Sequence, residues 1–231
     1  MTGYPYTGES LLARPCRYMY PPYGGTAFLA AWARDRRRCA EALSAVVVQA
    51  GPDPDLALPG ACLAVLEPLA GEWVDRAAPV LQRCAAFAPA SEAAPENAGN
   101  ELRLEPLLRA ALWRVARGAA GDAEAGLLRR LARKFEVAKL LHPVYGPDFR
   151  QGRGPTDDVG LYALLAAGLG LFARAGEDLV LLNALLKLCD LLCSETGPLS
   201  GRAEASALAL LALRIEDWRV RRLFPEGAAW C

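Results

Sequence analysis

The stretch that decides the fold is VGLYALLAAGLGLFA at residues 159–173, a run of 15 residues without a charge. A turn at residues 174–178 follows it, and a second apolar stretch continues through Cys193. A membrane-spanning helix needs about 20 apolar residues, so residues 159–173 are too few to cross a bilayer. We expect instead a central helical hairpin, buried on nearly all sides, around which amphipathic helices pack.

The composition predicts that the rest of the chain is also helical. Of the 231 residues, 53% are apolar, and alanine (44) and leucine (39) together exceed a third of the chain. Both residues favour helices. Apolar residues recur at helical spacing in segments that we interpret as further helices: 27–50, 60–88 with breaks near Pro68, Gly71 and Pro79, 104–115, 127–141 and 202–223. The fold class is therefore all-α, a single irregular helical bundle of about seven to eight helices.

Two segments differ in composition from this helical domain at residues 26–231. Residues 1–25 are rich in proline and hold five of the seven tyrosines, which predicts an extended N-terminal arm. The arm is expected to pack its rings on its own domain or on a partner or sister subunit. Alternatively, it forms a mobile lid over a ligand. Residues 89–100, PASEAAPENAGN, are small and polar and predict an exposed connector.

Charge is balanced overall but unevenly distributed along the chain. The 26 basic and 26 acidic residues cancel, whereas two clusters are strongly basic: Arg34, Arg36, Arg37 and Arg38, and Arg129, Arg130, Arg133 and Lys134. Each cluster is interpreted as a solvated face that pairs with acidic segments of the same chain or of a partner. A dedicated nucleic-acid surface is not expected, because it would need a net basic excess and interleaved aromatic residues.

The cysteine and histidine content excludes several kinds of metal site. Seven cysteines are dispersed along the chain and the single histidine is His142, so sites that need two imidazoles are ruled out. Cys189 and Cys193, four residues apart, are interpreted as buried free thiols. The polar N-terminus is unlike a secretory signal. We therefore expect a reducing, cytoplasmic location, no metal site and no cofactor.

A narrow polar stripe on the second apolar stretch is one candidate site. Asn183, Lys187, Asp190 and Ser194 fall within about 60° of one another at helical spacing. A lysine desolvated between an amide and a carboxylate has a lowered pKa, and its amine becomes available for proton transfer or Schiff-base chemistry. The competing interpretation is a solvent-facing seam in which Lys187 and Asp190 form an ordinary ion pair.

A second set of candidates lies in and after the irregular segment 142–156. His142 ends a predicted helix, where it either bonds terminal carbonyls or acts as a general base. Asp157 and Asp158 either cap the following helix or serve as paired carboxylates. Candidate anion- or ligand-binding residues near this segment are Arg150, Arg153 and Tyr162.

Two functions are consistent with these patterns. The first is a non-catalytic accessory or regulatory protein that binds a protein partner or a second copy of itself. The second is a small-molecule enzyme or ligand binder, with its pocket between the 159–193 hairpin and the 142–156 loop. In that second case Lys187, Asp190, Asp158 and His142 would supply the acid and base groups. Neither hypothesis places the protein in a membrane or on nucleic acid.

Overall fold

The computed structural model describes residues 25–66, 76–87, 104–119, 121–136, 158–174 and 202–223. It also describes six helical residues of the second apolar stretch: Ala184, Leu185, Leu188, Cys189, Leu192 and Cys193. In these ranges the chain forms α-helices, a short 3-10 turn and connecting turns, and no strand, which confirms the all-α class. The predicted arm and the connector at 89–100 lie outside the described residues.

The described helices follow the order of the predicted ones. They are α2 (Gly25–Ala50), α3 (Ala57–Leu66), α4 (Ala78–Cys84), α5 (Leu104–Ala116), α6 (Asp122–Glu136), α8 (Asp158–Arg174) and α11 (Ala203–Leu223), with the 3-10 turn η3 (Pro54–Leu56) before α3. Pro79 marks a helix boundary, as predicted, because it lies in the first turn of α4. Proline is tolerated there because the first-turn N–H groups have no partner within the helix.

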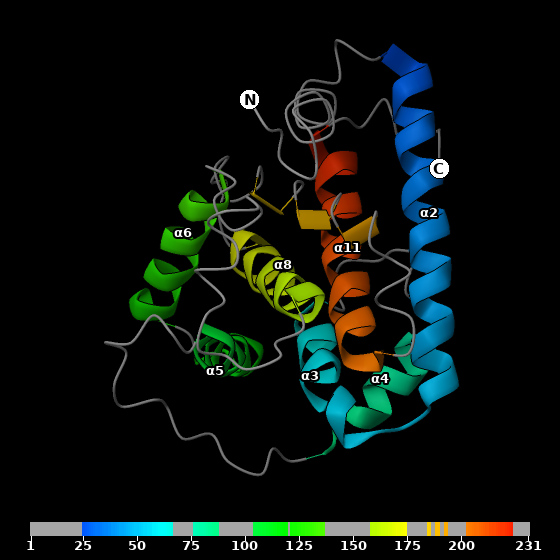
Figure 1. The fold of residues 1–231 in the computed structure, drawn as a ribbon. Helices are drawn as coiled ribbons and strands as arrows, with labels where there is room; N and C mark the ends of the chain where they lie inside the picture. Colours follow the sequence, from blue (N-terminus) through cyan, green and yellow to red (C-terminus); the bar gives the residue numbers. More distant parts are fainter. Residues whose placement is uncertain are drawn as a thin grey trace.

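Helix α11 is the most enclosed element of the described fold. All side chains from residue 205 to residue 217 are buried, and α2, α3 and α8 pack around the helix. Figure 1 shows α11 standing between α8 and α2. The sequence predicted a last helix at 202–223 but gave no sign that this helix also lies in the core. Arg214, Glu216 and Asp217 give it a polar character, although all three side chains are buried.

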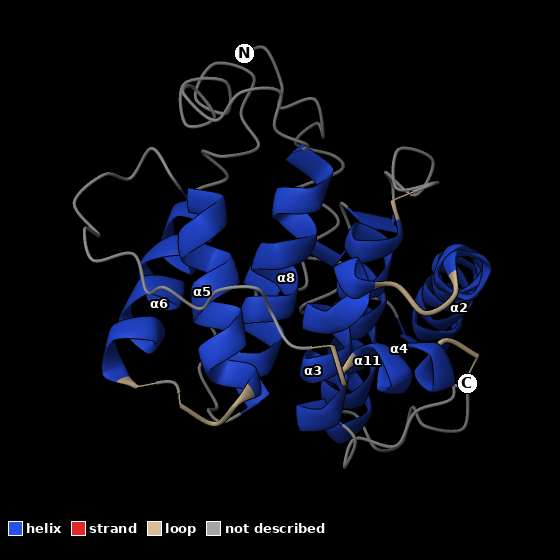
Figure 2. Ribbon diagram, turned by 90° about the horizontal axis from the view of Figure 1, so that it is seen from below, coloured by secondary structure: helices blue, strands red, loops and turns tan. Residues whose placement is uncertain are grey.

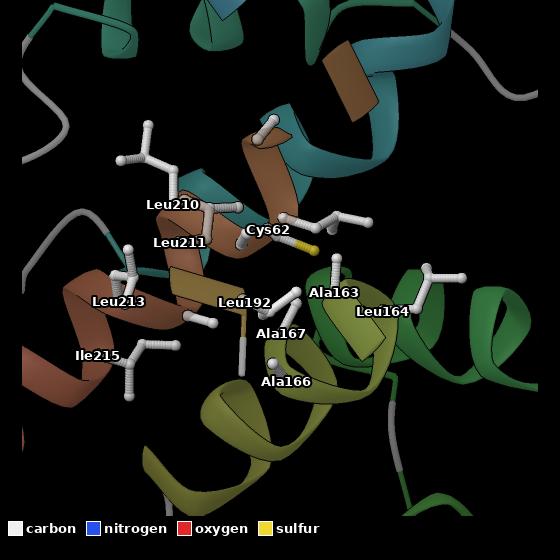
Figure 3. Packing of buried hydrophobic residues seen from close by; sticks show 14 of the residues in the cluster. Cys62, Ala163, Leu164, Ala166, Ala167, Leu192, Leu210, Leu211, Leu213 and Ile215 are labelled. Carbon is white, nitrogen blue, oxygen red and sulfur yellow. The ribbon is translucent and has the colours of Figure 1, made fainter. Parts of the chain in front are cut away.

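Helix α8 confirms that the first half of the predicted hairpin belongs to the core. Its residues 163–171 are all buried. Two glycines let other helices approach closely: Gly170 faces Ile215 of α11, and Gly168 faces Leu112 of α5 and Leu128 of α6. Figure 3 shows alanines of α8, with Leu192 of the second apolar stretch and leucines of α11, gathered in one cluster. Helix α8 therefore joins α11 to the α5–α6 pair.

Helices α5 and α6 form a second layer against α8, as Figure 2 shows. The turn between them uses Gly118 at a φ of 67°, a left-handed conformation that suits glycine. At the start of α6, the Glu124 side chain accepts a hydrogen bond from the Gly121 N–H at 2.8 Å. Glu124 also pairs with Arg114 of α5 at 2.6 Å, so one carboxylate both caps α6 and ties it to α5.

Helices α3 and α4 meet through their backbones. A Cβ atom added to Gly60 of α3 would lie 2.7 Å from the backbone nitrogen of Ala85 and would overlap the carbonyl oxygen of Leu81. Glycine is therefore required at this crossing. The preceding turn η3 is capped by Asp53, whose side chain accepts a hydrogen bond from the Asp55 N–H at 2.9 Å. Helix α3 and turn η3 contact α11, and α4 packs against both of them.

Candidate functional site

Most of the residues predicted as site residues lie outside the described part of the chain. These are His142, Arg150, Arg153, Asp157, Asn183, Lys187 and Asp190. Two others are placed only by their backbone: Asp158 begins α8, and Tyr162 lies on the same helix one turn later. The polar stripe, the paired carboxylates and the 142–156 loop thus stay predictions.

The described residues reveal a different polar cluster, which the sequence did not predict. Arg36 of α2 and Glu216 of α11 form an ion pair across 180 positions of sequence. The Arg36 Nε atom lies 3.1 Å from Glu216 Oε2, and it donates a hydrogen bond to Oε1 at 3.2 Å. The two residues are 1% and 0% exposed. A charge pair so completely removed from water ties α2 to α11 at one register.

Three cysteines surround this ion pair. Cys39 lies three residues after Arg36 on α2, and Cys189 and Cys193 lie one helical turn apart on the second apolar stretch. Besides burial, the Glu216 carboxylate raises the pKa of Cys189, and Cys39 raises the pKa of Cys193. The cluster therefore links three segments: α2, the second apolar stretch and α11.

The surroundings of these thiols favour their protonated form. Burial raises the pKa of Cys189 well above its usual value, and the negative charge of Glu216 adds to the effect. Burial likewise raises the pKa of Cys193, and the interaction of its thiol with Cys39 acts in the same direction. The Arg36 guanidinium opposes both effects without cancelling them. At neutral pH the Cys189 and Cys193 thiols beside the ion pair are therefore neutral, not activated thiolates.

The helical spacing of the sequence indicates that Arg36 is buried, but Arg36 was predicted to belong to a basic surface. Arg36 shares a helical face with Cys39, Ala40, Leu43 and Val47, all of which are buried. Arg34, Arg37 and Arg38 lie on the opposite side of α2 and are exposed. The basic cluster thus divides into one buried arginine and three exposed ones. Glu216 gave no comparable signal, because Arg214 and Asp217 beside it make it look like part of an exposed polar face.

The exposed side of α2 forms a continuous mixed surface, the α2 outer face. It consists of Arg34, Arg37, Arg38, Glu41, Ala42, Ala45 and Val48, which fall on one side of the helix and are all exposed. Val48 is 45% exposed, a large fraction for a valine in a helix. The face thus joins a basic end to an end of small and apolar side chains.

The structure describes only part of the second basic cluster, which the sequence places at residues 129–134. Arg129 and Arg130 of α6 are exposed, whereas the side chains of Arg133 and Lys134 lie outside the described residues. The Arg129 guanidinium stacks over the ring of Phe172 on α8, with 5.1 Å between the guanidinium carbon and the ring centroid. Part of this cluster therefore packs on the fold by a cation–π contact.

Neither a set of metal ligands nor a similarity to a known protein identifies the function of the site. Within the described ranges, no three histidine, cysteine, aspartate or glutamate side chains are grouped so that they could hold a metal ion. No described helix combines the length and the apolar content that a membrane crossing requires. The chain matches no known protein family, no curated protein and no solved structure. The function must therefore be argued from the residues themselves.

Proposed function

We propose that this protein is a non-catalytic binding protein that engages an acidic surface of a partner protein through the α2 outer face. The observation that carries the proposal is the exposure of this face along a helix whose opposite side is anchored in the core. Buried Arg36, Leu43 and Val47 hold α2 against the rest of the fold. The outer face is therefore presented on a rigid element, as a recognition surface requires.

The charges of the α2 outer face favour an acidic partner. It carries three arginines and one glutamate, so its local charge is positive although the whole chain is neutral. Arginine is well suited to protein interfaces because its planar guanidinium makes two parallel hydrogen bonds to a carboxylate. A neutral chain is poorly suited to nucleic acid, which is bound mainly through a larger basic excess.

The small and apolar end of the same face supplies the second element of an interface. Ala42 and Ala45 allow a partner helix to approach closely, and the exposed part of Val48 loses contact with water when it is covered. Charged pairs at an exposed rim contribute specificity and association rate more than affinity. The apolar end would contribute the affinity that the arginines alone do not provide.

The interior chemistry is consistent with binding rather than with catalysis. Buried Arg36 is paired with the Glu216 carboxylate, and burial raises the pKa values of Cys62, Cys189 and Cys193. A nucleophilic cysteine has the opposite property, a lowered pKa in a partly exposed position. These three thiols are thus held in their unreactive, protonated form.

The test is a charge reversal on α2 with a matched control elsewhere. The double variant Arg37→Glu/Arg38→Glu alters only exposed side chains, and the control Arg83→Glu/Arg130→Glu reverses two exposed arginines on α4 and α6. Proteins that co-purify with the wild-type chain are quantified against both variants. The partner is then purified, and its dissociation constant is measured by calorimetry at two salt concentrations.

We expect the partner to be lost with the α2 variant and retained with the control. The affinity of the purified partner should fall at least roughly tenfold on charge reversal and should weaken with added salt. Equal binding by the α2 variant and the wild type would overturn the proposal. So would a partner whose binding responds only to the control pair.

A further inference from the structure

We infer that the partner covers the α2 outer face with an amphipathic α-helix that packs lengthwise along α2. The contact side of this partner helix carries carboxylates opposite the arginines of α2 and large aliphatic side chains opposite Ala45 and Val48. The inference rests on the binding function proposed above, and it adds the secondary structure and the side-chain pattern of the partner.

The exposed residues of α2 have the spacing at which two helices pack side by side. Five members of the α2 outer face follow one another at intervals of four, three, four and three residues, and we call them the outer seam: Arg34, Arg38, Glu41, Ala45 and Val48. Intervals that average about 3.5 residues keep side chains on one side of a helix, where they interlock with a second helix. Because α2 (Gly25–Ala50) is one uninterrupted helix, the outer seam is continuous.

The buried side of α2 already packs on a helix with this spacing. Its buried residues Arg36, Ala40, Leu43 and Val47 follow one another at intervals of four, three and four residues. Helix α11 packs against α2, and the ion pair from Arg36 to Glu216 joins the two helices. Both Figure 1 and Figure 2 show α2 at the edge of the described helices. The outer seam therefore offers a second helix the same kind of contact on the side of α2 that faces away from the fold.

The order of side chains along the outer seam determines the pattern of the partner helix. At one end Arg34 and Arg38 match carboxylates, to which a guanidinium can donate two parallel hydrogen bonds. At the other end Val48 is 45% exposed and lies one turn after Ala45, whose small side chain leaves room for a leucine. Arg38 and Val48 are ten residues apart, about 15 Å along the helix axis. A matching helix therefore separates its carboxylates from its large aliphatic side chains by a similar length.

A second copy of this chain does not match the α2 outer face in charge. Two such faces in contact would set three arginines and one glutamate against the same four charged residues. Like charges that face each other disfavour an interface, whereas a helix rich in carboxylates is attracted. The covering helix therefore belongs to a protein of different sequence.

The experiment measures the binding of synthetic helical peptides to the full-length protein by fluorescence anisotropy. Two seam peptides carry Glu, Glu, Lys, Leu and Leu at the intervals of the outer seam, one in each chain direction, on a background of alanine and glutamine. A control peptide has the same composition, but its leucines lie on the opposite side of the helix. Circular dichroism verifies that all three peptides are helical.

Two protein variants of unchanged charge separate helix packing from electrostatic attraction. Ala45→Gln places a longer side chain in the outer seam, and the matched control Ala123→Gln makes the same change at an exposed position of α6. Glutamine is a good helix former, so neither variant should unfold its helix. The charge reversal Arg37→Glu/Arg38→Glu is measured beside them, and each protein is tested at two salt concentrations.

We expect one of the seam peptides to bind, and the control peptide to bind at least roughly tenfold more weakly because its leucines are not buried in the contact. Ala45→Gln should weaken binding of the seam peptide by roughly fivefold or more, since its side chain occupies the space of a leucine. The dependence of binding on salt should stay unchanged in Ala45→Gln and should decrease in the charge reversal. Ala123→Gln should bind the seam peptide as the wild type does.

Three results would overturn the inference: equal binding of the seam and control peptides, absence of binding by both seam peptides, and an affinity that Ala45→Gln leaves unchanged. A wild-type dimer in sedimentation velocity that Ala45→Gln dissociates would also overturn it, because a second copy would then cover the face. If the charge reversal abolishes binding of the purified partner while no seam peptide binds, the proposed function stands and only this inference fails. If the charge reversal leaves partner binding intact, the proposed function fails, and this inference fails with it.

Discussion

The Arg36 guanidinium of α2 and the Glu216 carboxylate of α11 meet inside the protein, 3.1 Å apart between Nε and Oε2 and almost without solvent contact. Desolvation of two charges costs several kcal/mol, and their attraction in the interior offsets that cost only while both are present. The pair therefore contributes little net stability but penalises any packing of α2 that separates the two residues.

Removal of one partner should destabilise the fold strongly. The variant Glu216→Gln leaves the Arg36 charge buried without a counter-charge, and we expect the free energy of unfolding to fall by about 3–5 kcal/mol. The double variant Arg36→Met/Glu216→Met replaces the pair by apolar side chains and should recover most of that loss. Urea denaturation of the single and double variants measures both effects.

The Arg109–Glu204 ion pair between α5 and α11 serves as the comparison. It is bidentate, with Arg109 Nη2 at 2.7 Å from Glu204 Oε2, but its side chains are 37% and 24% exposed. Water therefore screens either charge when its partner is removed, and Glu204→Gln should cost only about 1 kcal/mol. Equal costs for Glu204→Gln and Glu216→Gln would contradict the explanation from burial.

Two glycines at helix crossings should differ in their tolerance of alanine. A Cβ atom at Gly170 would overlap the Cδ1 atom of Ile215, the flexible end of a side chain, so we expect Gly170→Ala to cost about 1–3 kcal/mol. Adding Ile215→Val should recover part of this loss. A Cβ atom at Gly60 would meet backbone atoms of Leu81 and Ala85, so Gly60→Ala should cost more, with no side-chain substitution able to relieve it.

Gly126 provides the matched control for these substitutions. It lies on α6, and the nearest atom to an added Cβ is the end of the Arg130 side chain at 3.8 Å. Alanine is a better helix former than glycine by about 1 kcal/mol, so Gly126→Ala should raise the thermal midpoint. A similar loss of stability in all three variants would show that the helix crossings are not the cause.

The periodic spacing of apolar residues was sufficient to predict most of the described fold. It predicted the all-α class and a helix at 202–223, where α11 spans Ala203–Leu223. These predictions succeeded because a helix that buries one face repeats its apolar residues every three or four positions.

The buried charges could not be predicted in the same way. A helix that is buried on all sides has no single apolar face that marks its buried positions. Glu216 and Asp217 therefore look, in the sequence, like residues on the exposed side of a surface helix. Which carboxylate meets Arg36 depends on how α2 and α11 pack, and residues 180 positions apart share no local pattern. The predicted Lys187 and Asp190 stripe lies outside the described residues and stays a prediction.

The cap of α6 should make part of the stability sensitive to acid. The hydrogen bond from the Gly121 N–H holds the pKa of Glu124 below its usual value of 4.5, and the nearby Arg114 charge acts in the same direction. Because the pKa is lowered on folding, this contribution is present above the usual pKa and is lost as the pH falls. We expect Glu124→Ala to cost about 1 kcal/mol at pH 7 and much less at pH 3. Glu124→Gln keeps an acceptor oxygen and should lie between the two; an equal cost of Glu124→Ala at both pH values would contradict a charged cap.

Alkaline conditions should destabilise the core through its thiols. Burial raises the pKa of Cys62 from 9.0 to about 12. Because the folded pKa is the higher one, the contribution of this thiol to stability is complete below pH 9 and is lost as the pH rises from 9 towards 12. For this one group the free energy of unfolding should fall by about 1.4 kcal/mol between pH 8 and pH 10, and Cys189 and Cys193 act in the same direction.

The variant Cys62→Ala isolates that contribution. It should be less stable than the wild type at pH 7, because a buried sulfur is lost and a small cavity remains. Its further loss between pH 8 and pH 10 should nevertheless be smaller than that of the wild type by about 1.4 kcal/mol, because the titrating group is absent. Urea denaturation of both proteins under reducing conditions at the two pH values gives the comparison. If the wild type and Cys62→Ala lose the same free energy over this range, the Cys62 thiol does not titrate as a desolvated group.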